Sequence, residues 1–340
     1  MKPNYPVAIK GGVGQQATES RTRIHLNGTK RMLKASGLML EGIRKIVDLG
    51  CRNGDTTLGV LQEAPKDAKV IGIEEYREAL LLAKAKFGVS SEKEAMHIAD
   101  LISEMPEGWI ETFRNESEEF KDRTSFFTSQ VENMPELIQN ADLIFGFQIL
   151  HWLNANEDGF PTTETLAAIN QSLAPGGKFL AGTSTAFVEL SPEEKVEGKK
   201  KSEYDFNAHP FVKMFFARVG EIIEKLTGKT PIPIVNKPQL SMDKLTNLLE
   251  SVGFRDVQHG GFLATNGREE LLFRVLPLTA VHQGRLGGIA PEQRELVTQL
   301  ALNYTNADCE LIVMEGKPDP RLVETNVYDV VPFILATKAN

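Results

Sequence analysis

Short apolar runs alternate with segments of helical spacing along the first part of the chain. The predicted strands cover residues 46–50, 69–74, 124–131, 141–147 and 178–185. The predicted helices cover residues 55–63, 76–88 and 161–173, with one short helix before residue 141. Short, fully apolar strands separated by helices predict a parallel sheet with helices on both faces.

Helical patterns also flank this alternation. Residues 17–43 carry apolar positions at helical spacing and predict one or two helices before the first strand. After the fifth strand, Ser191 and Glu194 form a capping box, and residues 209–228 form an amphipathic helix rich in aromatic side chains. The alternation then returns with a helix over 241–254, a strand over 255–264, a helical region to about 304 and a strand over 328–338. We therefore expect an α/β fold with a doubly wound, mostly parallel, seven-stranded Rossmann-like sheet, N-terminal helices and a helical insertion after strand 5.

Composition and charge narrow the classes of function. The 340 residues are 41% hydrophobic and 25% charged, which is ordinary for a globular protein. A net charge of −8 argues against a nucleic-acid partner, because binding to a phosphate backbone needs a basic face. Cys51 and Cys309 alone cannot make a disulfide framework or a zinc site, so we expect a reducing compartment and no metal. No run approaches a membrane span and the N-terminus lacks the apolar core of a signal peptide, which predicts a cytoplasmic protein without a membrane partner.

The segment "IVDLGCRNGDTT", residues 46–57, holds the most informative loop. A buried strand runs into Asp48, Gly50 and Gly54. A dinucleotide-binding turn would need glycines where Arg52 and Asp55 stand, so NAD is disfavoured, and no P-loop pattern is present. An acid at the strand end followed by G-x-x-x-G suits a ligand without phosphates that carries an amino group, a carboxylate and an adenosine. S-adenosyl-L-methionine is such a ligand.

"VDLGCRNG" resembles the first motif of class I S-adenosylmethionine-dependent methyltransferases. The resemblance continues in order through five further segments: "VIGIEE", "SQVENMP" (129–135), "DLIFGFQILHWL" (142–153), "LAPGGKFL" (173–180) and "LLESVGFRDV" (248–257). It covers most of residues 44–185 and 240–338. Within the family, "LHW" and the C-terminal layout look most like small-molecule carboxyl methyltransferases such as the trans-aconitate and juvenile hormone acid enzymes.

The resemblance implies roles for individual residues. Glu74 would take both ribose hydroxyls, with Glu75 as the competing candidate, and residues 129–135 would border the adenine. Gln130 stands where the family usually has an acid, and its amide oxygen can accept from the adenine amine. The expected cofactor-binding residues are Asp48, Gly50, Cys51, Gly54, Glu74, Glu75, Gln130, Val131, Glu132, Gly146 and Phe147.

Arg52 replaces the usual middle glycine of the loop. We expect its side chain to point outward to the rim of the site, with a backbone that needs no positive φ. The alternative is that its guanidinium reaches over the site to hold a substrate carboxylate.

Methyl transfer from a sulfonium needs an acceptor held about 3 Å from the methyl carbon, so positioning does most of the work. A carboxylate acceptor needs no base, whereas a hydroxyl acceptor usually does. His151 is the candidate base or positioning group and His209 a second candidate, while a purely structural histidine is the alternative for either. The expected substrate-binding residues are Gln148, Trp152, His209, Phe211 and Phe215, although an aromatic stripe at helical spacing is more often core.

Together these features predict an O-methyltransferase acting on a small organic acid or hydroxyl-bearing metabolite, with specialised metabolism as one setting. The expected organisation is an N-terminal helical lid (1–43), a cofactor-binding core (44–186), a helical insertion acting as substrate lid (187–240) and the C-terminal part of the core sheet (241–340). Homodimer formation is left open. The alternative is a protein of the same fold that binds S-adenosylmethionine for a non-methylating rearrangement or only as a regulatory ligand.

Overall fold

The computed structural model describes residues 12–91, 93–94, 97, 114–153, 160–183, 209–228, 241–267, 289–315, 320–322 and 326–339. Within these residues the chain forms one seven-stranded sheet in the order β3-β2-β1-β4-β5-β7-β6. The strands are β1 (Lys45–Leu49), β2 (Lys69–Glu74), β3 (Thr124–Thr128), β4 (Ala141–Gly146), β5 (Leu173–Gly182), β6 (Phe254–Gly267) and β7 (Asn326–Lys338). Strands β1 to β5 pair in parallel, and β7 runs antiparallel to both of its neighbours. The predicted mostly parallel, seven-stranded α/β sheet is confirmed.

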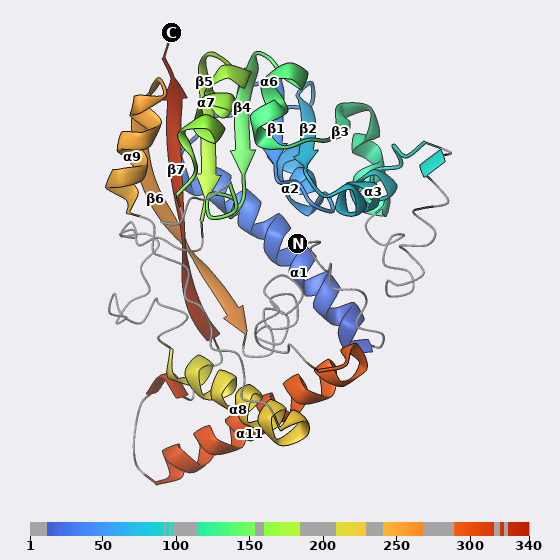
Figure 1. The fold of residues 1–340 in the computed structure, drawn as a ribbon, viewed down its shortest axis with the longest axis vertical. Coiled ribbons are helices and arrows are strands. Elements are labelled where there is room, and N and C mark those ends of the chain that lie inside the picture. Colours follow the sequence, from blue (N-terminus) through green and yellow to red (C-terminus); the bar gives the residue numbers. More distant parts are fainter. Residues whose placement is uncertain are drawn as a thin grey trace.

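Helices cover both faces of the sheet, because successive residues of a buried strand point to opposite sides. Ile46 of β1 joins the core on one face, and Val47 joins the core on the other. The first core is covered by α1 (Gly12–Ala35), α2 (Asp55–Glu63) and α3 (Arg77–Lys86). The second is covered by α6 (Met134–Leu137), α7 (Thr163–Ser172) and α9 (Met242–Ser251). Figure 1 shows these layers around the sheet.

Strands β6 and β7 continue past the sheet as a two-stranded ribbon (Figure 1). Only residues 333–337 of β7 pair with β5, whereas β7 pairs with β6 along nearly its whole length. The free part of the ribbon extends beyond the carboxyl end of β5. Beyond its far end lie α8 (Pro210–Thr227) and α11 (Pro291–Met314), which pack on each other with the short 3₁₀ helix η6 (Pro320–Leu322).

Several element boundaries differ from the sequence predictions. The one or two helices predicted over residues 17–43 are one helix, α1, which runs from Gly12 to Ala35, and α11 continues to Met314 instead of ending near 304. The third strand ends at Thr128 instead of residue 131. The 3₁₀ helix η1 (Glu118–Arg123) precedes it and the 3₁₀ helix η2 (Val131–Asn133) follows it. A helical insertion was expected after strand 5. Its described helix, α8, lies beyond the strand ends and pairs with α11, which comes from the part of the chain assigned to the core sheet. The capping box at residues 191–194 lies outside the described residues.

Candidate active site

Asp48 is buried at the end of β1 and anchors the loop that follows. Its Oδ2 accepts hydrogen bonds from the hydroxyls of Thr56 at 2.7 Å and Thr57 at 2.6 Å, both in the first turn of α2. Its Oδ1 is buried and has no hydrogen-bond partner within the described residues. Burial raises the pKa of Asp48 from 3.8 to about 6, against the opposing effect of the two threonine hydroxyls. An ionised Asp48 therefore has a buried acceptor for which a ligand cation would be a favourable partner.

The loop after Asp48 is fixed to the end of β2. The N–H groups of Gly50 and Cys51 donate to the carbonyl of Ile73 at 2.8 and 3.1 Å. Gly50 and Gly54 have φ angles of 71° and 85°, a left-handed conformation that glycine adopts without steric cost. The two glycines predicted from the sequence thus occupy positions where the backbone needs them.

Cys51 follows Gly50 in the loop, with its side chain turned towards the core. Its thiol is buried against the core, where burial raises its pKa well above the ordinary range. Its N–H donates to Ile73 and its carbonyl accepts from the N–H of Gly54 at 2.8 Å. Both of its backbone groups bond within the protein and its side chain faces inward, and a contact between Cys51 and a cofactor stays a prediction.

Arg52 adopts a left-handed backbone with φ 49°. The prediction that this position needs no positive φ is wrong. Arg52 is the first central residue of the tight turn that is closed by the hydrogen bond from the Gly54 N–H to the Cys51 carbonyl at 2.8 Å, and several turn types need a positive φ at this position. The N–H of Arg52 itself donates to Oε2 of Glu74 at 3.0 Å across the site. The side chain of Arg52 is only partly exposed, and its charge partly opposes the rise that burial causes in the pKa of Glu74.

Glu74, at the end of β2, is 5% exposed. Each of its carboxylate oxygens accepts one backbone N–H: Oε2 from Arg52 and Oε1 from Tyr76, both at 3.0 Å. Burial raises the pKa of Glu74, and these two hydrogen bonds and the Arg52 charge partly oppose the rise. The neighbouring Glu75 is exposed, so of the two candidates Glu74 is the one built into the loop.

The ends of β2 and β3 bring the expected adenine-side residues together. Oε1 of Glu75 accepts from Nε2 of Gln130 at 3.3 Å across these strand ends. Val131 and Glu132 follow in η2, and the Glu132 carboxylate accepts a hydrogen bond from the hydroxyl of Thr165 in α7. Glu132 thus links η2 to α7, a contact that the sequence did not predict.

A turn after β4 brings a further side chain to the loop. A Cβ added to Gly50 would lie 2.4 Å from Cδ1 of Ile149, and one added to Gly146 would lie 2.5 Å from Cγ2 of the same residue. Ile149 thus packs against glycines from β4 and from the loop after β1. Gln148, just before it, adopts a φ of 52° to make the turn. Sequence reasoning missed Ile149, although facing glycines at two neighbouring strand ends are a signal that one side chain fills the space between them.

His151 lies where β4 and β5 end. Its Nδ1 is 3.2 Å from the hydroxyl of the buried Thr183, and the N–H of Leu150 donates to the carbonyl of Gly182 at 3.2 Å. Its ring centroid is 5.2 Å from that of Trp152, whose side chain is 45% exposed. The turn therefore holds a partly exposed pair of rings at the carboxyl edge of the sheet.

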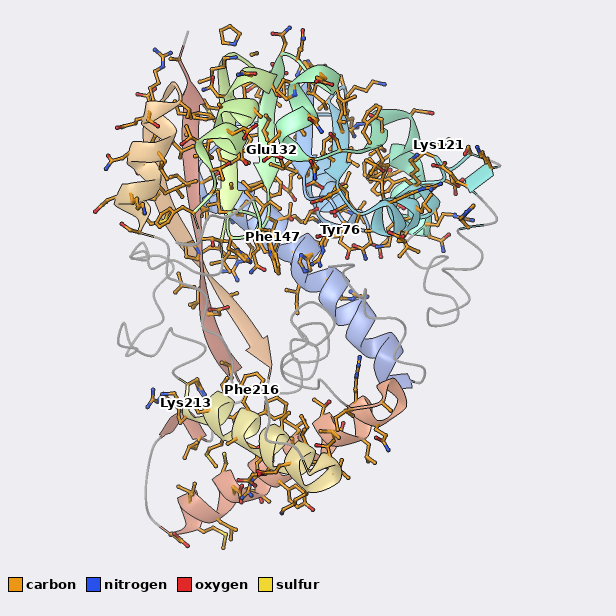
Figure 2. The ribbon with its side chains drawn as sticks, viewed as in Figure 1. Tyr76, Lys121, Glu132, Phe147, Lys213 and Phe216 are labelled. Carbon is orange, nitrogen blue, oxygen red and sulfur yellow. The ribbon has the colours of Figure 1, made fainter. Side chains whose placement is uncertain are left out.

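Helix α1 also lies at this edge, where it packs against Phe147, the residue after β4 (Figure 2). The Phe147 ring packs against Gly28, where an added Cβ would lie 2.4 Å away, and meets the His25 ring edge-on at 5.6 Å. Met32 lies against Gly182 at the end of β5. Helix α1 thus covers the ends of β4 and β5, and His25, which was not expected at the site, comes with it.

The aromatic residues of α8 lie elsewhere. Phe211 and Phe215 are fully buried in the interior between α8 and α11, packed with Val212, Val219, Val297, Ala301 and Leu302. The expectation that they line a substrate pocket is corrected, since their rings have no exposed surface and fill the core of this helix pair. His209, directly before α8, is 2% exposed, and the described contacts of this helix pair do not bring it to the loop.

A buried ion pair lies behind the loop. Nζ of Lys86 in α3 contacts Oδ1 of Asp55, the first residue of α2, and the two side chains are 3% and 7% exposed. The Lys86 carbonyl accepts from the hydroxyl of Ser117 at 2.6 Å. Asp55 stands where a dinucleotide-binding turn has its third glycine, and the pair shows what the chain gains there: a charged contact that ties α2 to α3.

Comparisons with known proteins give limited matches. No protein-family model matches the chain. It is 34% identical over 84 residues to an uncharacterized methyltransferase of Emericella nidulans, a stretch that covers 23% of this chain and 29% of that relative. Among solved structures, the YcgJ protein of Bacillus subtilis aligns over 92% of this chain and 99% of its own, with 10% identity and a TM-score of 0.43. Phosphoethanolamine N-methyltransferase 2 of Haemonchus contortus, solved with S-adenosyl-L-methionine, aligns over 92% and 53%, with 14% identity and a TM-score of 0.42.

None of the helices in the described residues is both long enough and apolar enough to cross a membrane.

The similarity to these solved structures, with TM-scores of 0.43 and 0.42, is too low to identify the fold, which is identified from the strand order itself. The order β3-β2-β1-β4-β5-β7-β6, with β7 as the antiparallel strand, fits the fold of class I S-adenosylmethionine-dependent methyltransferases.

Proposed function

We propose that the loop from Asp48 to Gly54 and the ends of β2 and β4 bind S-adenosyl-L-methionine. The observation that carries this proposal is the buried Oδ1 of Asp48, which has no hydrogen-bond partner within the described residues. A buried carboxylate oxygen without a donor costs free energy, and a ligand ammonium group would remove that cost. The methionine part of the cofactor carries such an ammonium group.

The Glu74 carboxylate is suited to accept hydrogen bonds from the two ribose hydroxyls of the cofactor. Each carboxylate oxygen can accept more than one hydrogen bond, and each already accepts one backbone N–H from Arg52 or Tyr76. Those two bonds fix the orientation of the carboxylate and leave acceptor capacity for two hydroxyl donors. Gln130 and Glu75, paired at the ends of β3 and β2, would border the adenine.

When bound, S-adenosylmethionine would supply a methyl group activated by its sulfonium. The protein's part is then to hold an acceptor in line with that methyl, which is mainly a matter of position. Gln148, His151 and Trp152 follow β4 at the same edge as the loop. The contact between Nδ1 of His151 and Thr183 sets the orientation of the ring, as hydrogen bonds to one imidazole nitrogen commonly do.

We propose a small organic acid as the acceptor, with a hydroxyl-bearing metabolite as the competing class. A carboxylate acceptor needs only hydrogen bonds from neighbouring groups, whereas a hydroxyl acceptor needs His151 as a base. His151→Ala separates them. With a carboxylate acceptor the loss appears mainly in KM, and with a hydroxyl acceptor kcat falls by about 10²–10⁴-fold.

Calorimetry tests the cofactor proposal. We expect S-adenosylmethionine and S-adenosylhomocysteine to bind with similar affinity and NAD to bind poorly. Glu74→Gln should weaken binding at least tenfold, because hydrogen bonds to a charged acceptor contribute roughly 1.5–3 kcal/mol each. Glu75→Gln, at the exposed neighbour, is the matched control and should change affinity less. Tighter binding of NAD than of S-adenosylmethionine, or an unchanged affinity for S-adenosylmethionine in Glu74→Gln, would refute the assignment.

A mass-spectrometric screen of candidate acceptors tests the reaction. Accumulation of S-adenosylhomocysteine together with a methylated product supports methyl transfer. Conversion of a substrate without S-adenosylhomocysteine would instead show a non-methylating reaction at the same site.

A further inference from the structure

Helix α11 is apolar on two faces. One face packs on α8 and includes Val297, Ala301, Thr305 and Cys309, all of which are buried. These residues recur every four positions, as expected for one side of a helix in a core. The helix pair therefore already has its own interior, and the opposite face of α11 is largely exposed.

The second face is an exposed apolar stripe. The side chains of Leu296, Tyr304, Leu311 and Met314 are 60%, 54%, 57% and 82% exposed. Leu300 and Ala307 complete the row, the first half-buried and the second exposed. The six positions are separated by 4, 4, 3, 4 and 3 residues, a spacing that puts them on one side of the helix over about five turns. A single exposed leucine is ordinary, whereas a continuous apolar stripe marks an interaction surface.

We propose that this stripe pairs antiparallel with the same stripe of a second copy of the chain. The stripe reads almost the same in both directions about Thr305, so an isologous contact brings Leu296 opposite Met314 and Tyr304 opposite Ala307. Figure 1 shows α11 at the opposite end of the molecule from strands β1 to β5, so a second copy seated on the stripe would lie away from those strands.

Polar side chains beside the stripe favour the antiparallel arrangement. Glu310 lies along one edge of the stripe, and Gln299 lies along the same edge about three turns earlier. In the antiparallel pair Glu310 faces Gln299 of the other copy, and its carboxylate can accept from the amide. A parallel pair would place Glu310 and Gln299 of the two copies on opposite sides of the contact, without this hydrogen bond, and would align the two helix dipoles unfavourably.

A membrane surface fits this helix less well than a second copy. The α11 sequence has four acidic residues, Glu292, Glu295, Asp308 and Glu310, and one basic residue, Arg294. Helices that lie on anionic lipid carry lysine and arginine beside the apolar face, so the charge of α11 would oppose that contact. The contact with a second copy is small by the standard of stable interfaces, and we expect association at micromolar concentration.

Sedimentation of the full chain across a concentration series tests the proposal. The wild-type protein should approach twice the 37.6 kDa mass of one chain. Leu311→Glu should shift that transition to at least tenfold higher concentration. Leu226→Glu is the matched control, because Leu226 on α8 is 58% exposed and Leu311 is 57% exposed. Circular dichroism of both variants should match the wild type, since neither side chain is in the core. A wild-type monomer at every concentration, or a dimer that Leu311→Glu does not weaken, would overturn the proposal.

Cross-linking with a short bis-maleimide tests the orientation. Ala307→Cys, close to the centre of the stripe, should link two copies. Leu296→Cys should not, because in the antiparallel pair its two copies lie about 27 Å apart along the helix axis. Native Cys51 and Cys309 are buried, and the unmodified protein measures their background. Efficient linking at Leu296→Cys would show a parallel contact and refute the arrangement.

Discussion

Replacing Arg52 by glycine should make the protein slightly more stable, although it removes a charged side chain from the site. Arg52 has a φ of 49°, and a left-handed backbone costs a residue with a Cβ about 1–2 kcal/mol. Glycine removes that cost but gives the unfolded chain more freedom, which offsets about 0.4–1 kcal/mol. The hydrogen bond from residue 52 to Glu74 uses the backbone N–H and is kept. The net gain should be about 0.5–1 kcal/mol.

Urea unfolding of three proteins separates the contributions of backbone and side chain. Arg52→Ala keeps the Cβ and removes the guanidinium, so it reports the side chain alone. The difference between Arg52→Ala and Arg52→Gly reports the backbone, and we expect glycine to be the more stable of the two. Thermal unfolding should rise by about 1–3 °C in Arg52→Gly. If the glycine variant is less stable than the alanine variant, the strain argument is refuted.

Three further predictions concern buried groups around the loop. Asp48→Asn should flatten the pH dependence of unfolding free energy between about pH 4 and 6, measured by urea titration at several pH values. The pKa of Asp48 is raised to about 6 in the folded state, so the folded protein binds the extra proton and loses stability as pH rises through that window. Lys86→Met should cost about 3–5 kcal/mol by leaving Asp55 without its cation, while the double variant with Asp55→Leu should recover most of it; equal losses would contradict a pairing role. Gly28→Ala should cost about 1–3 kcal/mol because its Cβ would lie 2.4 Å from Phe147, and Phe147→Leu should restore stability in a thermal melt.

The strands were predictable because burial on both faces produces continuous apolar runs. In β1, Ile46 and Val47 face different cores, so neither position tolerates a polar residue. The ribbon was less predictable at its ends. Past the sheet, β6 and β7 pair only with each other, and the predicted strands stop short of Gly267 in β6 and of Asn326 in β7.

In the candidate site, the sequence predicted what depends on local spacing and missed what depends on distant contacts. Asp48, Gly50 and Gly54 lie within seven consecutive residues of the sequence, and the structure places them in one loop. The hydrogen bond from the N–H of Arg52 to Glu74, which lies 22 residues later, could not be inferred from the loop alone. Likewise, the contact of Ile149 with Gly50 joins two strands that are adjacent in the sheet and far apart in sequence.

The aromatic stripe of α8 shows the limit of periodicity. Its spacing correctly marks one buried face, but periodicity does not identify the partner of that face. Phe211 and Phe215 pack on α11, a helix that begins about 75 residues later in the chain. Whether these rings line a substrate pocket or fill a core therefore depended on a contact between distant segments, which a local sequence pattern cannot predict.

The insertion of β7 between β5 and β6 has a consequence for synthesis on the ribosome. β6 forms no hydrogen bonds with β5 and joins the sheet only through β7, which is translated later. Until β7 emerges from the ribosome, the nascent chain can form only a five-stranded parallel sheet. In that sheet the edge of β5 is open and β6 is unpaired. Such an open edge invites pairing with other chains. Ribosome-bound chains stalled between β6 and β7 should accordingly be the species most prone to aggregate and most dependent on chaperones.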